Sequence, residues 1–192
     1  MARIKHIFPR DELAHVWLRQ SQDEGRSAGR GQMYFDGDTI YSYGSHFPIA
    51  MIFKAPNGEE VILFTTRTYS NTTARHIAAV KSACNASHRR TIYCSRPDVC
   101  RLPSDHERNL SVFRSEMDES IAKHAKARKP ELYTVDILHQ ATLAREYCEV
   151  MCLPVPIWAQ LPGMNFVATD KLFRGEPLRA LLKIHAEEKV TA

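Results

Sequence analysis

The sequence predicts an α+β fold: an N-terminal helix, an antiparallel β-meander and a second helix, followed by a helical subdomain. Before residue 65, β-branched and aromatic residues cluster in short runs around the turn dipeptides Asp36-Gly37 and Asn57-Gly58. From residue 104 on, apolar residues instead recur at helical spacing. We therefore expect an α+β unit over residues 1–103 and a helical subdomain over 104–192, either separate or sharing one continuous core.

The first helix is expected to begin at Asp11, which can cap it, and to bury Leu13, Val16 and Trp17 on one side. The next stretch, SQDEGRSAGRGQ at 21–32, is rich in glycine and serine and is interpreted as a flexible connector. Two hairpins then follow in series, the second of them joining residues 49–53 to 61–64. Together they predict four antiparallel strands.

Helical spacing returns in SNTTARHIAAVKSACN, residues 70–85, where Ser70, Asn71 and Thr72 all suit the N-cap. A short strand, RTIYC, is expected at 90–94, and a loop leads from it to residue 103.

A capping-box pattern, Ser104-x-x-Glu107, predicts the start of the first helix of the C-terminal part. Pro130 ends that helix, and a second long helix is expected over about 131–151. The proline-rich stretch 153–163 cannot be helical, and a last helix is expected around 176–188.

Composition is that of an ordinary globular chain, with 44% hydrophobic and 25% charged residues among 192. The sequence has no apolar run long enough to cross a membrane and no secretory signal, so we expect a cytoplasmic location, in the producing cell or in an invaded host. The five cysteines follow no framework spacing and are interpreted as free thiols. The common motifs for nucleotide hydrolysis, dinucleotide binding and zinc proteolysis are absent.

Positive charge is concentrated in one segment, although the net charge is only +4. Between residues 67 and 101 the single acid Asp98 stands against Arg67, Arg75, Lys81, Arg89, Arg90, Arg96 and Arg101. This segment favours binding of a polyanion, either nucleic acid or an acidic protein surface. A solvated basic face is the alternative.

Two hydroxyl-rich stretches, YSYGSHFPIA at 41–50 and TYSNTTARH at 68–76, suggest a site. If the hairpin approaches the helix start, the N–H groups there could hold an anion, and His46 and His76 could act as acid and base in metal-independent phosphodiester cleavage. In a purely structural interpretation the same residues cap a helix and pair across strands. The candidate binding residues are Tyr41, Tyr43, Arg67, Tyr69, Thr72, Thr73, Arg75, Lys81, Arg89 and Arg90.

Cofactors are not indicated, apart from a zinc alternative. Cys84, His88, Cys94 and Cys100 have the residue types that zinc prefers, but their spacing lacks a tight knuckle. Trp158, in the proline-rich stretch, would anchor a protein partner if exposed, or cover the helices if buried.

The runs YSYGSHFPIA and YSNTTARH, together with Trp17, resemble a family of uncharacterised proteins encoded by bacteriophages and related mobile elements. The resemblance covers about residues 10–85. It implies a phage context and no particular reaction.

Three functions follow from these patterns. The first is a phage-type accessory or host-interaction protein that binds nucleic acid or an acidic host protein through its basic face. The second is a metal-independent nuclease or phosphodiesterase that uses His46 and His76. The third is a structural or assembly protein with an apolar interface, for which the sequence leaves the oligomeric state open.

Overall fold

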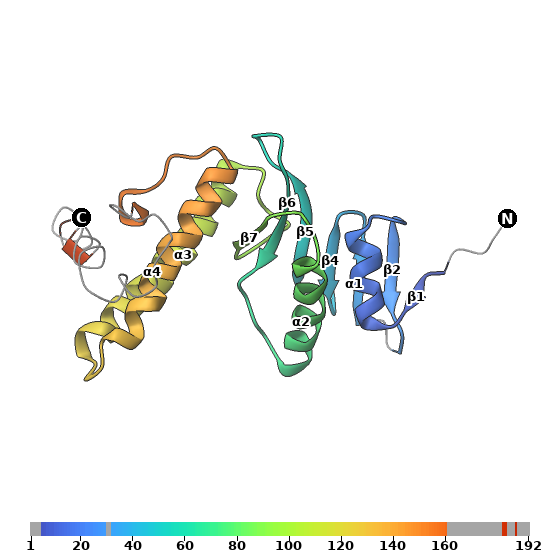
Figure 1. Cartoon of the computed structure of the whole chain (residues 1–192), viewed down its shortest axis with the longest axis horizontal. Coiled ribbons are helices and arrows are strands. Elements are labelled where there is room, and N and C mark those ends of the chain that lie inside the picture. The colour runs from blue at the N-terminus through green and yellow to red at the C-terminus, as the bar shows by residue number, and fades with distance from the viewer. Residues whose placement is uncertain (1–4, 30–31, 161–181, 184–186, 188–192) are drawn as a thin grey trace. The chain divides into compact units, whose positions relative to one another are not determined.

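The computed structural model describes residues 5–29, 32–160, 182–183 and 187. These residues belong to two compact units, one up to Asp105 and one from His106 on. The predicted α+β class is confirmed, because a seven-stranded, mostly antiparallel sheet is combined with α-helices (Figure 1).

The elements of the N-terminal unit are β1 (Ile7–Phe8), α1 (Arg10–Leu18), β2 (Glu24–Ser27), β3 (Met33–Asp36), β4 (Thr39–Ser42), β5 (Pro48–Lys54), β6 (Glu60–Thr65), α2 (Asn71–Asn85) and β7 (Thr91–Cys94). They are followed by α3 (Pro103–Lys126), α4 (Glu131–Val150) and a short 3-10 turn, η1 (Ile157–Ala159).

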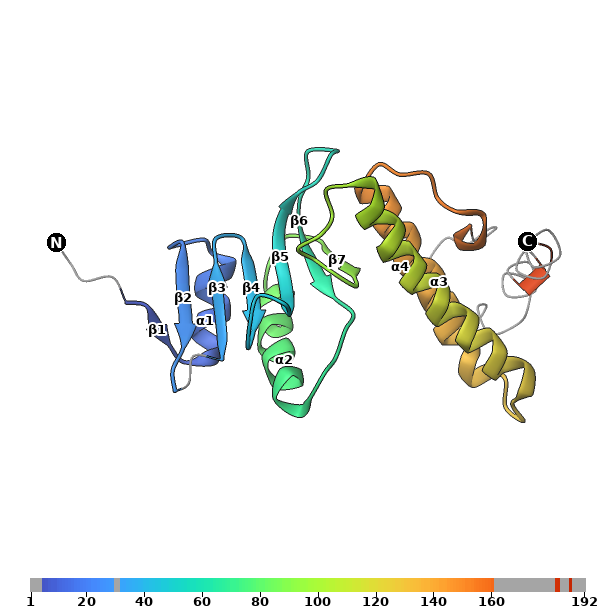
Figure 2. The ribbon, with the colours of Figure 1, turned by 180° about the vertical axis from the view of Figure 1, so that it is seen from behind.

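The strands lie in the sheet in chain order, from β1 at one edge to β7 at the other. The pairs β1–β2 and β6–β7 are parallel, and the four pairs between them are antiparallel. Each parallel pair is connected through a helix, α1 or α2, because parallel strands need a long crossover. Both helices lie on the same face of the sheet, as the front and back views agree (Figures 1 and 2).

The core of this unit lies between the sheet and the two helices. Trp17 of α1 and Val80 of α2 are fully buried and belong to the same apolar cluster as Phe35, Ile40 and Phe64 of the strands. The indole N–H of Trp17 also donates to the carbonyl of Asp38 at 2.9 Å, which ties α1 to the turn between β3 and β4.

Side chains alternate between the two faces along β4. Ser42 points to the helices, because its hydroxyl contacts His76 of α2. Tyr41 points the other way and stacks on Tyr34 of β3. We call the side of β2–β4 that faces away from the helices the open face.

Two expectations for the first 32 residues are wrong. Helix α1 begins at Arg10, with Pro9 at the N-cap and no side-chain cap, so Asp11 lies in the first turn. The presumed flexible connector contains strand β2. Its Gly25 is needed for packing, because a Cβ there would lie 2.6 Å from Cε1 of Phe35.

The hairpin turns are close to their predicted positions. In the first, Asp36 pairs with Thr39, so the turn residues are Gly37-Asp38, one position later than expected. The second hairpin is confirmed around Asn57-Gly58, where the Asn57 side chain accepts the Glu59 N–H at 2.9 Å.

Helix α2 follows Ser70, whose hydroxyl accepts the Thr73 N–H at 3.2 Å and thus serves as the N-cap. Helix α3 does not use the predicted capping box. It begins one residue before Ser104, and the Asp105 carboxylate accepts the Leu102 N–H at 3.1 Å instead.

In the C-terminal unit, α3 and α4 contribute to one apolar cluster that includes Met117 and Ile137. Trp158 packs half-buried against this cluster, with the guanidinium of Arg114 5.6 Å from its ring centre. The helix expected at 176–188 lies almost entirely outside the described residues. Among the helices of the described part, none has the length and apolarity that a membrane span requires.

Candidate functional site

The two hydroxyl-rich stretches meet at one end of the sheet. Phe47, in the turn before β5, contacts the ring of Tyr69 edge-on, with ring centres 6.2 Å apart. The guanidinium of Arg67 lies 5.3 Å from the centre of the same Phe47 ring. Tyr43 lies against His76, with ring centres 5.7 Å apart. The turn after β4 and the start of α2 therefore form one continuous surface.

His76 is a buried member of this region. Its ring is 5% exposed, and Nδ1 lies 2.8 Å from the hydroxyl of Ser42, which is 1% exposed. Burial, and then the positive charge of Arg10, lower the pKa of His76. A neutral, hydrogen-bonded imidazole stabilises the contact between β4 and α2, and the Ser42 hydroxyl has no access to a substrate.

His46 has the opposite environment. It is exposed in the turn after β4 and its ring lies over Gly44, where a Cβ would come within 2.8 Å of Nδ1. An acid–base pair needs both rings within reach of the same substrate. With His76 buried and His46 exposed, the geometry does not support that role for the two histidines.

Tyr43 owes its orientation to an unusual backbone conformation. Its φ is +65°, which is uncommon for a bulky residue. Tight hydrogen bonds hold the turn: the Gly44 N–H donates to the Ser42 carbonyl at 2.9 Å, and the Phe47 N–H to the Gly44 carbonyl at 3.0 Å. The tyrosine ring is therefore directed toward α2 and remains 49% exposed.

Tyr69 stands immediately before the N-cap of α2 and is 80% exposed. Its ring forms a T-shaped contact with Phe47, which is itself buried. The buried Phe47 ring thus packs against both Tyr69 and the Arg67 guanidinium.

Exposed cations continue along α2. Arg75 and Lys81 are both exposed, and the ammonium of Lys81 lies 5.7 Å from the ring centre of Tyr93. The helix has no carboxylate, and neither has any position from 61 to 97. We call the group Tyr43, Arg67, Tyr69, Arg75 and Lys81 the α2 surface.

Other predicted binding residues have structural roles. The Arg89 guanidinium, only 17% exposed, binds the Glu60 carboxylate and donates to the carbonyl of Leu18 at 3.0 Å. It therefore fixes the end of α1 to β6. Thr73 is buried beside the N-cap hydroxyl, and Arg90 is half-buried.

Tyr41 lies on the open face, away from the α2 surface. Its ring stacks on that of Tyr34 with centres 5.1 Å apart and an angle of 19°. Burial raises the pKa of Tyr34, with smaller contributions from Tyr41 and Asp36. Predicting Tyr41 as part of one constellation with His76 is therefore wrong, because strand alternation separates them.

The cysteines do not form the zinc alternative. Cys84, Cys94 and Cys100 are buried and His88 is exposed. Burial raises the pKa of the Cys84 thiol to about 12 and, together with the neighbouring Cys100 thiol, raises that of Cys94. Within the described ranges, no three histidine, cysteine or acidic side chains are placed to hold a metal ion.

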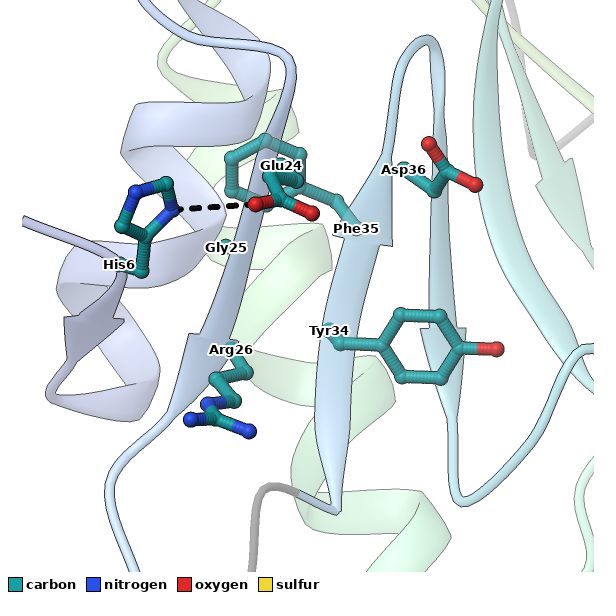
Figure 3. A pocket seen from close by; sticks show the side chains of 7 residues that line it. All are labelled: His6, Glu24, Gly25, Arg26, Tyr34, Phe35 and Asp36. Carbon is teal, nitrogen blue, oxygen red and sulfur yellow. Dashed lines mark ion pairs between the residues drawn. The ribbon is translucent and has the colours of Figure 1, made fainter. Parts of the chain in front are cut away.

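Sequence reasoning missed a pocket of about 630 Å³ on the open face (Figure 3). Its side chains carry both signs of charge, since Glu24, Arg26 and Asp36 line it, beside His6 and Tyr34. Nδ1 of His6 and the Glu24 carboxylate are 3.3 Å apart. The sequence signal for this pocket was the alternation of charged residues in β2. It was overlooked because residues 21–32 were interpreted as a flexible connector. Because its charges are mixed, this pocket does not favour a polyanion.

Comparison of the chain with protein-family models, curated proteins and solved structures gives no match. The site is therefore interpreted from its own geometry.

Proposed function

We propose that this chain binds nucleic acid through the α2 surface, as a phage-type accessory or host-interaction protein that acts in the cytoplasm. One observation carries the proposal: the exposed cations of α2, and half-buried Arg67 in the loop before it, belong to a stretch, 61–97, without a single carboxylate. A segment of one sign attracts a phosphate backbone, whose counterions are released on binding.

The cations differ in how available they are. Arg75 and Lys81 are exposed, and Arg67 is half-buried beside Phe47. Arg89 is excluded from the binding set because it holds Glu60 and the end of α1.

An acidic protein is the second partner that this charge distribution suits. The nuclease alternative has less support, because His76 is buried against Ser42. A role in assembly would have to use another region, such as exposed Ile157 beside Trp158.

The test is a fluorescence anisotropy titration of labelled DNA and RNA, single-stranded and duplex, over a series of salt concentrations with a chelator present. We expect the logarithm of the association constant to fall linearly with the logarithm of the salt concentration. The double variant Arg67→Gln/Arg75→Gln should reduce the slope by about 1.4 for a single strand, at about 0.7 for each lost phosphate contact.

Lys126→Gln/Lys129→Gln is the matched control, since both lysines are exposed, carry the same total charge and lie in the other unit. It should leave the slope unchanged. Equal weakening by both double variants would show that net charge alone attracts the polyanion and would overturn the proposal. Absence of binding to every nucleic acid, with binding to polyglutamate, would favour an acidic protein instead.

A further inference from the structure

Among the phenylalanine, tryptophan and tyrosine side chains that the structure describes, only Tyr43 and Tyr69 are exposed. Both lie on the α2 surface, one from the turn after β4 and one from the loop before α2. Aromatic rings are usually buried because water is a poor environment for them. Two exposed rings beside cations are typical of surfaces on which bases stack.

Each ring is held from one side and leaves surface free on the other. Tyr69 meets Phe47 at an angle of 73° and is 80% exposed, so most of its surface remains accessible despite this contact. Tyr43 rests against buried His76 at 40°. Rings fixed in this way lose little freedom when a ligand binds, which favours affinity.

Arg67 and Tyr69 share a buried support. Arg67 and Tyr69 contact the same Phe47 ring, so a guanidinium and an exposed aromatic side chain are supported by one buried residue. A nucleotide could place its phosphate on Arg67 and its base on Tyr69, the arrangement that single-strand-binding proteins use.

We propose that the α2 surface selects single-stranded nucleic acid and stacks a base on Tyr69, an inference that rests on the proposed function. Cations alone attract single strands and duplexes alike. Exposed rings add affinity only where base faces are accessible, and in a duplex those faces are stacked inside. The rings therefore discriminate between the two forms.

The experiment uses the full chain and three labelled probes of equal length: a deoxythymidine single strand, an abasic strand with the same phosphates but no bases, and a duplex. Affinities are measured at one fixed low salt concentration. The thymidine strand should bind tightest. Tyr69→Ala should weaken its binding by about 5- to 150-fold, from about 1–3 kcal/mol per stacked base. Tyr69→Phe, which keeps the ring, should restore most of the affinity.

Tyr41→Ala is the control, because it removes a tyrosine from the open face and should leave the affinity unchanged. If all three probes bind equally and Tyr69→Ala has no effect while binding remains salt-dependent, single-strand selection is wrong and the proposed function stands. If no probe binds, both are wrong. Near-ultraviolet circular dichroism of each variant confirms that the fold is retained.

Discussion

The N-terminal unit contains two tyrosine pairs that share a residue type and differ in everything else. Tyr34 and Tyr41 stack on each other on the open face, close to the carboxylate of Asp36. Tyr43 and Tyr69 are exposed, and their rings pack against His76 and Phe47. In the first pair each ring covers a face of the other, whereas the second pair leaves ring surface free for a ligand.

The difference originates at a single backbone position. Tyr41 and Tyr43 are two residues apart and would share a face if β4 continued. The strand ends at Ser42, and the positive φ of Tyr43 turns its ring toward α2. Neighbours in the sequence therefore have different roles because one dihedral angle interrupts the alternation.

The largest stability effect is expected for an arginine that faces inward. Arg89→Ala should lower the free energy of unfolding by about 1.5–3 kcal/mol, because it removes charge-assisted hydrogen bonds to Glu60 and to the end of α1. Arg75→Ala, at an exposed position, should change it by less than about 0.5 kcal/mol. Urea unfolding of both variants measures the difference, and equal effects would contradict the structural role of Arg89.

The two tyrosine pairs should also contribute differently to the free energy of unfolding, although by a smaller amount than the two arginines. Tyr41→Ala removes a stacked pair and should cost about 0.5–1.5 kcal/mol beyond the lost apolar contact. Tyr69→Ala should cost less than about 0.5 kcal/mol, since its ring is mostly in solvent. Thermal melts would reveal the order, and a larger loss for Tyr69 would mean that it is a packing residue.

The smallest expected effect concerns the buried support of Tyr43. Because burial and Arg10 lower the pKa of His76 in the folded state, the unfolded chain binds the proton more readily. The stability that neutral His76 provides is complete above the ordinary histidine pKa of 6.5. This stability decreases as the pH drops below 6.5 toward the lower pKa that His76 has in the folded state.

Unfolding midpoints in urea at about pH 7.5 and about pH 5.5 test this expectation. The native chain should lose more stability on acidification than His76→Gln, which has no group to titrate there. The same loss in both would show that other groups account for the pH dependence.

Local chemistry in the sequence was sufficient for much of the fold. The Asn57-Gly58 turn could be predicted, and the cap of α2 could be narrowed to Ser70, Asn71 or Thr72, because both features depend on residues within one turn. Strand β2 was missed because glycine suggests flexibility, whereas Gly25 is there to accommodate Phe35. That requirement exists only once α1 and the sheet have packed together.

The candidate site was predictable only in outline. The two hydroxyl-rich stretches meet, as expected from a hairpin followed by a helix. The separation of Tyr41 from Tyr43 and the use of Arg89 as a clamp depend on a dihedral angle and on a contact with distant Leu18. Neither has a signature in the local sequence.

Strand order has a consequence for how this unit forms during synthesis. Every strand pairs only with the strands next to it in chain order. The four antiparallel pairs have short loops to close, which favours fast folding, whereas each parallel pair must wait for the helix between its strands. As the chain leaves the ribosome, each new strand can add to an edge that already exists, and β7 completes the sheet after α2 has emerged.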